Sequence, residues 1–165
     1  MASKKAKKKK STTEDPNSRT ICRNRRARHD FEIIEELECG IALMGSEVKS
    51  IRNNKITIDE AYARIQKNEL WLLNCDVAEY PQATYLNHER RRERKLLIKK
   101  REFRKFAESA GHDGMTLIPL AVYFRRGMIK VLIASAKGRK IYDNREKKKK
   151  DQDRRAMQDA VRKRY

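Results

Sequence analysis

Residues 31–43 read FEIIEELECGIAL, and this stretch decides the fold class of the chain. Apolar residues occupy odd-numbered positions in it, among acidic neighbours: Phe31, Ile33, Leu37 and Cys39. A period of two is typical of a β-strand with one buried face, so we expect a strand here. Gly40 interrupts the pattern before the alternation resumes, which predicts a bulge or a corner at that residue.

Two hairpins are expected further along the chain. Residues 61–65 and 70–77 flank a polar turn, and alternation places Trp71, Leu73, Cys75 and Val77 on one face. Residues 115–124 and 128–136 also alternate, and they flank the sequence Arg125-Arg126-Gly127. Both pairs of segments have the composition of antiparallel strands joined by short turns.

Two helices and a long loop complete the predicted elements. Gly45-Ser46 provides a turn and an N-cap for a short helix, with Val48 and Ile51 on its buried face. Residues 100–110 have the apolar spacing of a second helix. Residues 79–94 show no apolar period and are interpreted as a loop, followed by a short strand at 95–98.

These elements favour a mainly β fold with flanking helices, built as a small antiparallel closed barrel of the oligonucleotide-binding type rather than as a parallel sheet. We expect a disordered basic arm at 1–22, a barrel domain at 23–136 and a basic tail at 137–165. The tail has helical bias, so it is expected to be disordered when free and helical once a polyanion neutralises it.

The charge distribution points to a polyanionic partner. The chain carries 42 Lys and Arg against 23 Asp and Glu, a formal net charge of +19 over 165 residues. Residues 1–28 hold 11 bases and 2 acids, residues 90–105 hold 10 and 2, and residues 137–165 hold 13 and 5. This balance argues against an ordinary neutral metabolic enzyme. Neither arm has the bulky apolar residues of a membrane-binding helix, so nucleic acid is favoured.

No motif for catalysis or metal binding occurs. The cysteines and histidines are Cys22, Cys39, Cys75, His29, His88 and His112. Their spacing fits no zinc site, and phosphate-binding loops and nucleophile elbows are absent. We expect no enzyme activity, metal, cofactor or small-molecule substrate. No segment approaches the about 18 apolar residues of a membrane helix or the apolar core of a secretory signal, so a cytoplasmic protein is expected.

Three arginine-rich or lysine-rich runs are candidates for RNA contact. They are NRRARH at 24–29, RRRERK at 90–95 and KKREFRK at 99–105. Arginine makes bidentate contacts with phosphate and stacks on bases. Tyr80, Tyr85 and His88 in the long loop could stack on unpaired bases. For any single run, the alternative is a solvated face without a ligand.

Several segments together resemble a known family. NRRARHDFEI, ECGIALMGSEVKSIR, YARI, NELWLLNC, RKLLIKKRE and AKGRKIYDNRE occur in this order between residues 24 and 146. They are similar to segments of the SsrA-binding proteins (small protein B), the bacterial partners of transfer-messenger RNA. The resemblance implies a barrel of the oligonucleotide-binding type and a function in trans-translation. It implies a non-enzymatic adaptor that binds the tRNA-like domain and enters the ribosomal A site, with its tail in the empty message channel.

The resemblance also implies two sets of functional residues. The first is an RNA-binding surface, to which the basic run at 90–95 adds three arginines: Asn24, Arg25, Arg26, Arg28, His29, Glu38, Lys95 and Leu97 from the resemblance, and Arg91, Arg92 and Arg94 from the run. The second lies at the ribosomal decoding centre: Lys137, Gly138, Arg139, Lys140, Tyr142, Asp143 and Arg145. Because a carboxylate repels phosphate, Glu38 is expected to meet a base edge or a ribose hydroxyl. The alternative for Glu38 is a strand residue that only pairs with an arginine.

Other functions stay open at this point. A structural ribosomal-type protein could have the same barrel and the same basic arms. An RNA-modifying enzyme would need a cofactor motif or a pocket of perturbed acids, which the sequence does not display. We expect a monomer whose partners are transfer-messenger RNA and the ribosome.

Overall fold

Strands dominate the part of the chain that the structure describes, which comprises residues 19–83, 87–111, 114–139 and 157. In this computed structural model the elements are β1 (Arg19–Arg23), α1 (Ala27–Asp30), β2 (Phe31–Ile41), α2 (Gly45–Arg52), β3 (Ile56–Thr57), β4 (Tyr62–Gln66), β5 (Glu69–Leu73), β6 (Asp76–Val77), β7 (Arg94–Leu97), α3 (Lys100–Ala110), β8 (Met115–Arg125) and β9 (Met128–Gly138). The predictions for residues 1–18, Tyr85, His112, Lys140, Tyr142, Asp143, Arg145 and the tail helix fall outside the described residues.

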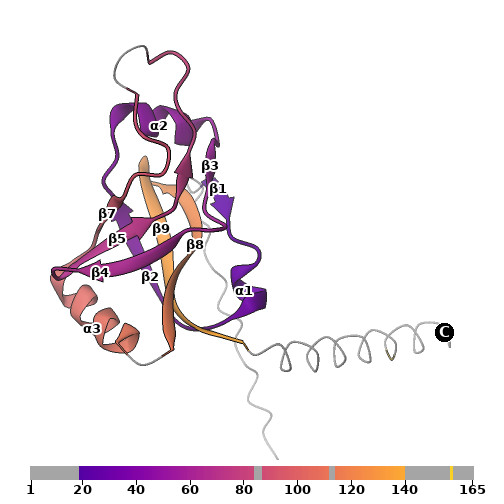
Figure 1. Cartoon of the computed structure of the whole chain (residues 1–165), viewed down its shortest axis with the longest axis vertical. Coiled ribbons are helices and arrows are strands. Elements are labelled where there is room, and N and C mark those ends of the chain that lie inside the picture. Colours follow the sequence, from indigo (N-terminus) through magenta and orange to yellow (C-terminus); the bar gives the residue numbers. More distant parts are fainter. Residues whose placement is uncertain (1–18, 84–86, 112–113, 140–156, 158–165) are drawn as a thin grey trace, which may run out of the picture.

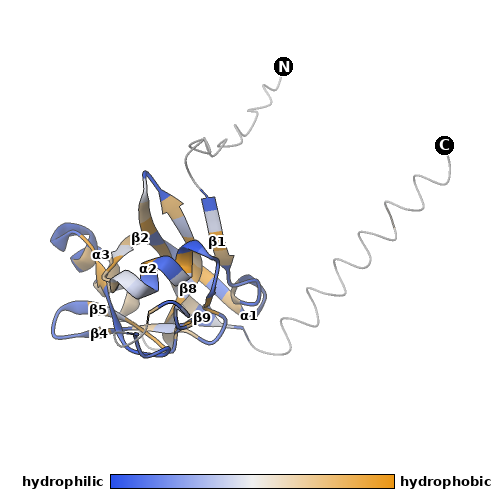
Figure 2. Cartoon of the chain, turned by 90° about the horizontal axis from the view of Figure 1, so that it is seen from above, coloured by the Kyte–Doolittle hydropathy of each residue, from blue (hydrophilic) through white to orange (hydrophobic). Residues whose placement is uncertain are grey.

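Seven strands form one antiparallel sheet in the order β1-β8-β4-β5-β7-β2-β9, and β9 also pairs with β8 (Figure 1). The pairing between β4 and β8 is limited to Ala63 and Leu117, whereas β8 and β9 pair along their whole length. The helices lie around this curved sheet, and its turns and α3 are largely hydrophilic (Figure 2). The mainly β fold with flanking helices is therefore confirmed.

The predicted second hairpin is also present. β8 and β9 are joined by Arg126 and Gly127, which have φ angles of 50° and 76°. Positive φ at both central residues is the requirement of the two-residue turn that best matches the twist of antiparallel strands. The last pair before the turn is Arg125 opposite Met128, so the turn sets the register of the longest pairing in the sheet.

A β-bulge lets β2 contribute to two cores. The register of β2 with β9 shifts between Ile33 and Glu35. An extra residue in a strand moves the following side chains to the opposite face of the sheet. Phe31 and Ile33 therefore pack in a small cluster with residues of α1, β8 and β9, whereas Leu37 packs with Cys39 in the main core. The apolar residues at odd-numbered positions are thus turned inward, but those before and after the bulge lie on opposite faces of the sheet.

The prediction of a bulge at Gly40 was wrong. Gly40 pairs in regular register with Leu97 on one side and with Lys130 on the other. A Cβ on Gly40 would lie 3.3 Å from the Cβ of Leu97. The interruption of the sequence pattern thus marks a close approach of β7 to β2, which a side chain would oppose.

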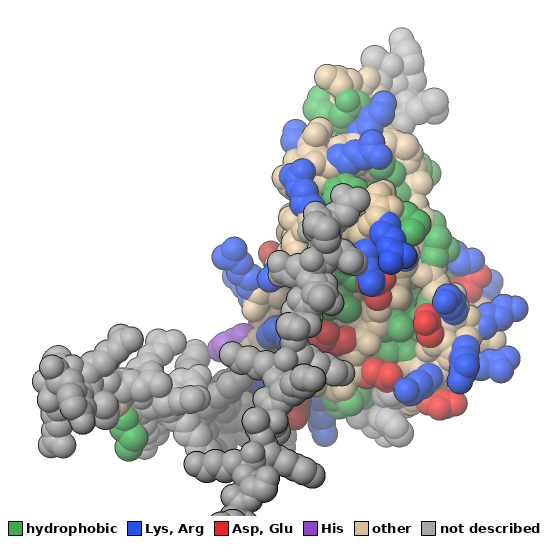
Figure 3. All heavy atoms as spheres, turned by 180° about the vertical axis from the view of Figure 1, so that it is seen from behind, with side chains coloured by type: hydrophobic (Ala, Val, Ile, Leu, Met, Phe, Trp, Pro, Cys, Tyr) green, Lys and Arg blue, Asp and Glu red, His purple; other side chains and the backbone are tan. Residues whose placement is uncertain are grey.

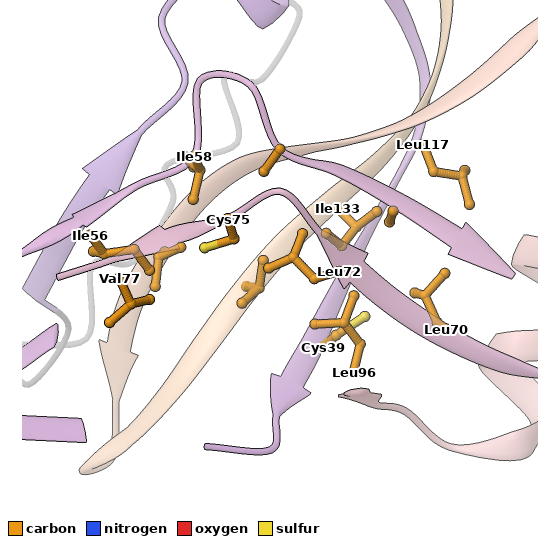
Figure 4. Close-up of a cluster of buried hydrophobic side chains, with 14 of the residues drawn as sticks. Cys39, Ile56, Ile58, Leu70, Leu72, Cys75, Val77, Leu96, Leu117 and Ile133 are labelled. Carbon is orange, nitrogen blue, oxygen red and sulfur yellow. The ribbon is translucent and has the colours of Figure 1, made fainter. Parts of the chain in front are cut away.

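The main core lies inside the curve of the sheet, as Figure 4 shows. Its buried side chains from β5 and the segment after it are Leu70, Leu72, Cys75 and Val77. Trp71 and Leu73 are only half-buried, so the predicted common face of Trp71, Leu73, Cys75 and Val77 was wrong. Asn74, with a φ of 55°, ends the regular alternation before Cys75.

The sheet extends further at both ends than the domain boundaries at 22 and 136 predicted. Residues 19–22, assigned to the disordered arm, belong to β1, which pairs with β8. Ile21 and Cys22 pack against the main core. At the other end, β9 continues through Lys137 and Gly138, which were assigned to the tail. β1 covers an edge of β8 that would otherwise expose unpaired backbone groups.

Both predicted helices form, but the buried face of α2 differs from the expected one. Glu47, Ser50 and Ile51 are buried, whereas Val48 is half-exposed. The N-cap is Met44 rather than Ser46, and its backbone N–H donates a hydrogen bond of 2.7 Å to the Glu47 carboxylate. A charged residue therefore occupies the side of α2 that was expected to be apolar.

Glu47 holds two arginines in the interior. Arg94 is fully buried, and its Nε donates to Glu47 Oε1 at 2.9 Å. Arg92 donates through Nε and a terminal nitrogen to both carboxylate oxygens. The other donors of Arg94 bind the backbone carbonyls of Cys75, Arg90 and Arg92. A buried ion pair is tolerated when its hydrogen-bonding groups are satisfied, and this network ties α2 to the end of the long loop.

The charge state of Glu47 follows from this network. Burial acts to raise the pKa of Glu47, but hydrogen bonds from Arg92 and Met44 and the charges of Arg94 and Arg92 outweigh burial and lower the pKa. A carboxylate whose folded pKa is depressed contributes stability above its unfolded pKa and loses it as the pH falls through the folded value. Glu47 is therefore ionised and stabilising at neutral pH.

Two more contacts anchor the loop between β6 and β7. His88 is buried, with Nδ1 3.0 Å from Ser46 Oγ and Nε2 3.2 Å from the carbonyl oxygen of Val77. Arg90 donates two hydrogen bonds of 3.0 Å to Asp76. The ring of His88 is thus a structural anchor and cannot stack on an RNA base in this conformation.

Removal of residues 1–23 should destabilise the domain, whereas removal of residues 1–18 should not. The longer deletion removes β1 and takes Ile21 and Cys22 from the core, which costs about 2–4 kcal/mol in apolar burial. Urea unfolding of both truncated chains beside the full chain measures the difference. Equal midpoints for the two truncations would mean that β1 adds nothing to stability.

Glu47→Gln should lower the free energy of unfolding by about 3–5 kcal/mol at pH 7, because it leaves two arginines without their charge partner. The full chain should also lose stability as the pH falls below the ordinary glutamate value of 4.5, and the variant should lack this part of the loss. Urea unfolding between pH 3 and pH 7 measures both effects.

Glu69→Gln is the matched control, because it removes the half-exposed pair with Lys95 and should cost at most about 1 kcal/mol. A Glu47→Gln chain as stable as Glu69→Gln would contradict a central role for the buried pair.

Candidate RNA-binding site

The first basic run lies on a braced turn. Asn24 is buried, and its Oδ1 accepts a hydrogen bond of 2.9 Å from the N–H of Ala27. The N–H of Asn24 donates to the carbonyl of Leu120 at 2.9 Å. Arg25 and Arg26 project from this turn and are exposed. Asn24, predicted to contact RNA, therefore holds the turn that presents the two arginines.

The turn, β2 and the end of β9 meet at one place. The guanidinium of Arg28 pairs with Glu36 Oε1 of β2 at 2.9 Å. His29 Nδ1 lies 2.6 Å from Asp30 Oδ1. The N–H of Arg139, the residue after β9, donates to the carbonyl of Asp30 at 3.0 Å. β9 ends beside α1 in both views of the chain (Figures 1 and 2). The structure thus brings the first basic run together with Lys137, Gly138 and Arg139.

Glu38 lies two residues beyond Glu36 on the same face of β2. Its Oε2 accepts hydrogen bonds from the Tyr123 hydroxyl and from Arg125, the latter at 2.8 Å. Tyr123 and Arg125 belong to β8 and reach Glu38 across β9, which lies between the two strands. The Glu38 side chain is 31% exposed, so it is held in one position without being enclosed.

Electrostatics keep Glu38 ionised. Partial burial acts to raise its pKa, but hydrogen bonds from Tyr123 and Arg125 and the charges of Arg125 and Lys130 outweigh burial and lower the pKa. Burial and the hydrogen bond to Glu38 raise the pKa of Tyr123, so its hydroxyl keeps its proton. The pairing expected as the alternative for Glu38 is thus present, and both of its donors bind one carboxylate oxygen, Oε2, of a side chain that is partly exposed.

A shallow groove runs beside Glu38 along β2, β7 and the β8–β9 hairpin. Two adjoining hollows share Gly40, Leu97 and Lys130, and one of them also includes Glu38 and Lys99. Leu97 is 51% exposed, unusual for a large apolar side chain, and projects next to Gly40. We call this surface, lined by Glu38, Gly40, Leu97, Lys99 and Lys130, the Glu38 groove. It combines an apolar floor, the fixed carboxylate of Glu38 with Glu36 and Glu102 in the same hollow, and two bases.

The second basic run does not contribute to the surface as predicted. Arg94 is fully buried on Glu47 and therefore cannot reach RNA in this fold, whereas Arg92 also binds Glu47 but stays 23% exposed. Arg91 is exposed but lies 4.0 Å from acidic oxygens of Glu60 and Asp76. Lys95 pairs with Glu69. The bases of this run therefore bind acidic residues elsewhere in the chain. Arg92 and Arg94 are the most enclosed of them.

Sequence reasoning missed Tyr123, Arg125 and Lys130, which shape the charge of Glu38. The contacts of Tyr123 and Arg125 with Glu38 span 85 and 87 residues, so no local pattern reveals them. One signal was available: alternation puts Tyr123 and Arg125 on the face of their strand opposite Val122. Of the predicted stacking rings, Tyr80 is half-buried with Lys49 5.2 Å from its centre.

The described residues contain no group of three or more His, Cys, Asp or Glu side chains placed to hold a metal ion. None of the described helices has the length and apolar character needed to span a lipid bilayer. What these residues do offer is a held carboxylate and an exposed leucine between basic edges, which suits a ligand with both anionic and hydrogen-bond-donating groups.

Comparison with known proteins identifies the family. The family model described as SmpB protein matches residues 21–163. The SsrA-binding protein of Trichodesmium erythraeum is 49% identical over 86% of this chain and 91% of its own length, and that of Rhodopirellula baltica is 47% identical over 89% and 84%. A chain in the solved structure "tmRNA-SmpB: a journey to the center of the bacterial ribosome" is 46% identical, with a TM-score of 0.61, over 73% of this chain and 85% of that one. On this match the chain belongs to the SmpB family of SsrA-binding proteins.

Proposed function

We propose that this chain is an RNA-binding adaptor that binds the tRNA-like domain of transfer-messenger RNA and delivers it to stalled ribosomes for trans-translation. The names of its relatives, which are SsrA-binding proteins, and the solved complex of tmRNA and SmpB with the bacterial ribosome support this proposal. The adaptor acts as a monomer in the cytoplasm and without an enzymatic step, a cofactor or a small-molecule substrate.

The observation that carries the proposal is the ionised, oriented carboxylate of Glu38 in a protein of net charge +19. A carboxylate repels phosphate, so its place in an RNA-binding surface implies a partner that donates hydrogen bonds. Base amino groups, ring N–H groups and ribose 2′-hydroxyls are such donors. The exposed Leu97 in the same groove offers an apolar contact to a base or a sugar. This combination favours a folded RNA with exposed bases over a regular duplex.

The arrangement at the end of β9 supports a second RNA contact. Residues 137–165 hold 13 bases and 5 acids, and they leave the domain where Arg139 is bonded to Asp30, beside Arg25 and Arg26. The tail therefore starts next to the first basic run rather than in the Glu38 groove. We assign the groove to transfer-messenger RNA and the tail, with Lys140, Tyr142, Asp143 and Arg145, to the ribosomal decoding centre and message channel.

Glu38→Ala should weaken binding of the tRNA-like domain by about tenfold or more, because it leaves a donor on the RNA without its partner. Titration of the purified RNA domain measures the affinity, and sequencing of the RNA that copurifies measures selectivity. The full chain should enrich transfer-messenger RNA over bulk tRNA, and the variant should lose this enrichment.

Glu32→Ala is the matched control, since it removes an exposed carboxylate of the same strand that does not line the groove. It should leave affinity and enrichment close to those of the full chain. Lack of enrichment by the unaltered chain would refute the proposed function, and retention with ribosomal subunits through a high-salt wash would favour a structural ribosomal-type protein.

Truncation after Arg139 should spare binding of the tRNA-like domain and abolish tagging of stalled products. The truncated chain keeps β9 intact, including Lys137 and Gly138, and keeps the bond from Arg139 to Asp30. RNA affinity and tagging in a reconstituted translation reaction are the two readouts. An equal loss of affinity and tagging would show instead that the tail is a general anchor for phosphate.

A further inference from the structure

The basic stripe at residues 90–105 is divided in two by its partners. The bases of its first half all face acidic side chains: Arg90 and Arg91 face Asp76, Arg92 and Arg94 face Glu47, and Lys95 faces Glu69. Three carboxylates thus offset the larger part of the positive charge of these five bases within the protein. The sequence alone does not distinguish this half from the other.

The second half lies on α3 and keeps its charge. Its bases are exposed, and none has an ion pair with another described residue: Lys99, Lys100, Arg101, Arg104 and Lys105. Lys100 and Arg104 are four residues apart, as are Arg101 and Lys105, and like charges at this spacing on a helix repel each other. A helix that keeps such a repulsion at its surface is stabilised by any ligand that supplies negative charge.

Packing fixes the direction of this basic face. Phe106 is buried, and Phe103 and Ala110 pack against the main core. Since these residues define the inner side of α3, Arg101, Arg104 and Lys105 are directed outward. At this end of the molecule, at lower right in Figure 3, Lys and Arg side chains lie at the surface with several Asp and Glu side chains among them. The face is therefore preorganised and does not depend on a flexible segment.

α3 also adjoins the Glu38 groove. Lys99, directly before the helix, lines the same hollow as Glu38, and Glu102 of the first turn lines it too. On the other side of β7, Lys100 and Phe103 line a further hollow with Lys95. The basic face of α3 thus continues the groove at its edge, so a ligand larger than the groove would extend over it.

The chemistry of the face indicates phosphate groups of RNA rather than a membrane. None of the large exposed apolar side chains of the described residues lies on α3, and a membrane-binding helix needs such side chains between its bases. Two of the outward bases are arginines, which make bidentate contacts with phosphate oxygens. Backbone contacts of this kind position an RNA without reading its sequence.

We propose that the outward face of α3, formed by Lys100, Arg101, Arg104 and Lys105 with Lys99 at its edge, holds backbone phosphates of the same RNA whose bases or sugars meet Glu38. The inference rests on the proposed function of the Glu38 groove. It divides the work: Glu38 and Leu97 select the RNA, and α3 supplies electrostatic affinity.

The test is the double variant Arg101→Gln/Arg104→Gln of the full chain, titrated with the tRNA-like domain at several salt concentrations. Each lost phosphate contact should reduce the slope of log affinity against log salt by about 1, so a reduction of about 2 and a loss of affinity of about tenfold or more are expected. Both side chains are exposed, so the thermal unfolding midpoint should not change.

Arg90→Gln/Arg91→Gln is the matched control, because it removes the same two charges from residues that already face Asp76. It should change the slope by less than half as much. A control that weakens binding as much as the α3 variant would show that total charge, not the α3 face, governs affinity, and would overturn the inference.

Two further outcomes would also overturn it. One is an unchanged salt slope for the α3 variant in a series in which Glu38→Ala weakens binding. That result would refute the role of α3 and leave the proposed function intact. The other is an α3 variant that loses binding to ribosomes but not to the tRNA-like domain, which would assign the face to another RNA. Failure of the unaltered chain to prefer the tRNA-like domain would instead refute the proposed function itself.

Discussion

The fold of this protein depends on a carboxylate buried where an apolar residue would be expected. Glu47 lies on the inner side of α2 and binds Arg92 and Arg94 from β7 and the loop before it. Desolvation of a charge is costly. The buried ion pair is therefore tolerated only if both partners are in contact and all their donors are satisfied. This requirement for complete hydrogen bonding fixes the relative positions of α2, the long loop and β7. The Glu38 groove borders both α2 and β7 and inherits that precision.

The same interaction explains which bases remain for RNA. An arginine run in a sequence looks the same whether it binds phosphate or an acid of its own chain. Glu47 precedes Arg94 by 47 residues and Asp76 precedes Arg90 by 14, so only the fold shows that these arginines are occupied. Within the described part of the chain, the basic runs near α1 and on α3 have no such distant acids, apart from the exposed pair of Arg28 with Glu36. The positive charge at the surface is thus what remains after internal ion pairs have formed, and composition alone does not predict where it lies.

The sequence could predict those elements whose apolar residues recur with the period of a helix or a strand. α3 has the predicted limits because Phe103, Phe106 and Ala110 recur at helical spacing. The hairpin at Arg126-Gly127 was recognised because apolar residues alternate in the segments on both sides of it. β1 was missed because two half-buried residues, Ile21 and Cys22, are too short a pattern to show alternation. The bulge after Ile33 and the partners of Glu38 depend on strands far away in the chain, so only the family resemblance pointed to Glu38.

A negative charge at the centre of a basic protein has a physical logic. Bases attract every polyanion, so charge alone gives affinity for all RNA and preference for none. A fixed carboxylate lowers affinity for any surface that presents phosphate to it and restores it only where the RNA offers a donor. Glu38 is suited to this because Tyr123 and Arg125 occupy one of its oxygens and keep it ionised. Under the proposed function, selectivity comes from a penalty on the wrong ligand, and basic residues outside the groove, such as those of α1 and α3, offset that penalty.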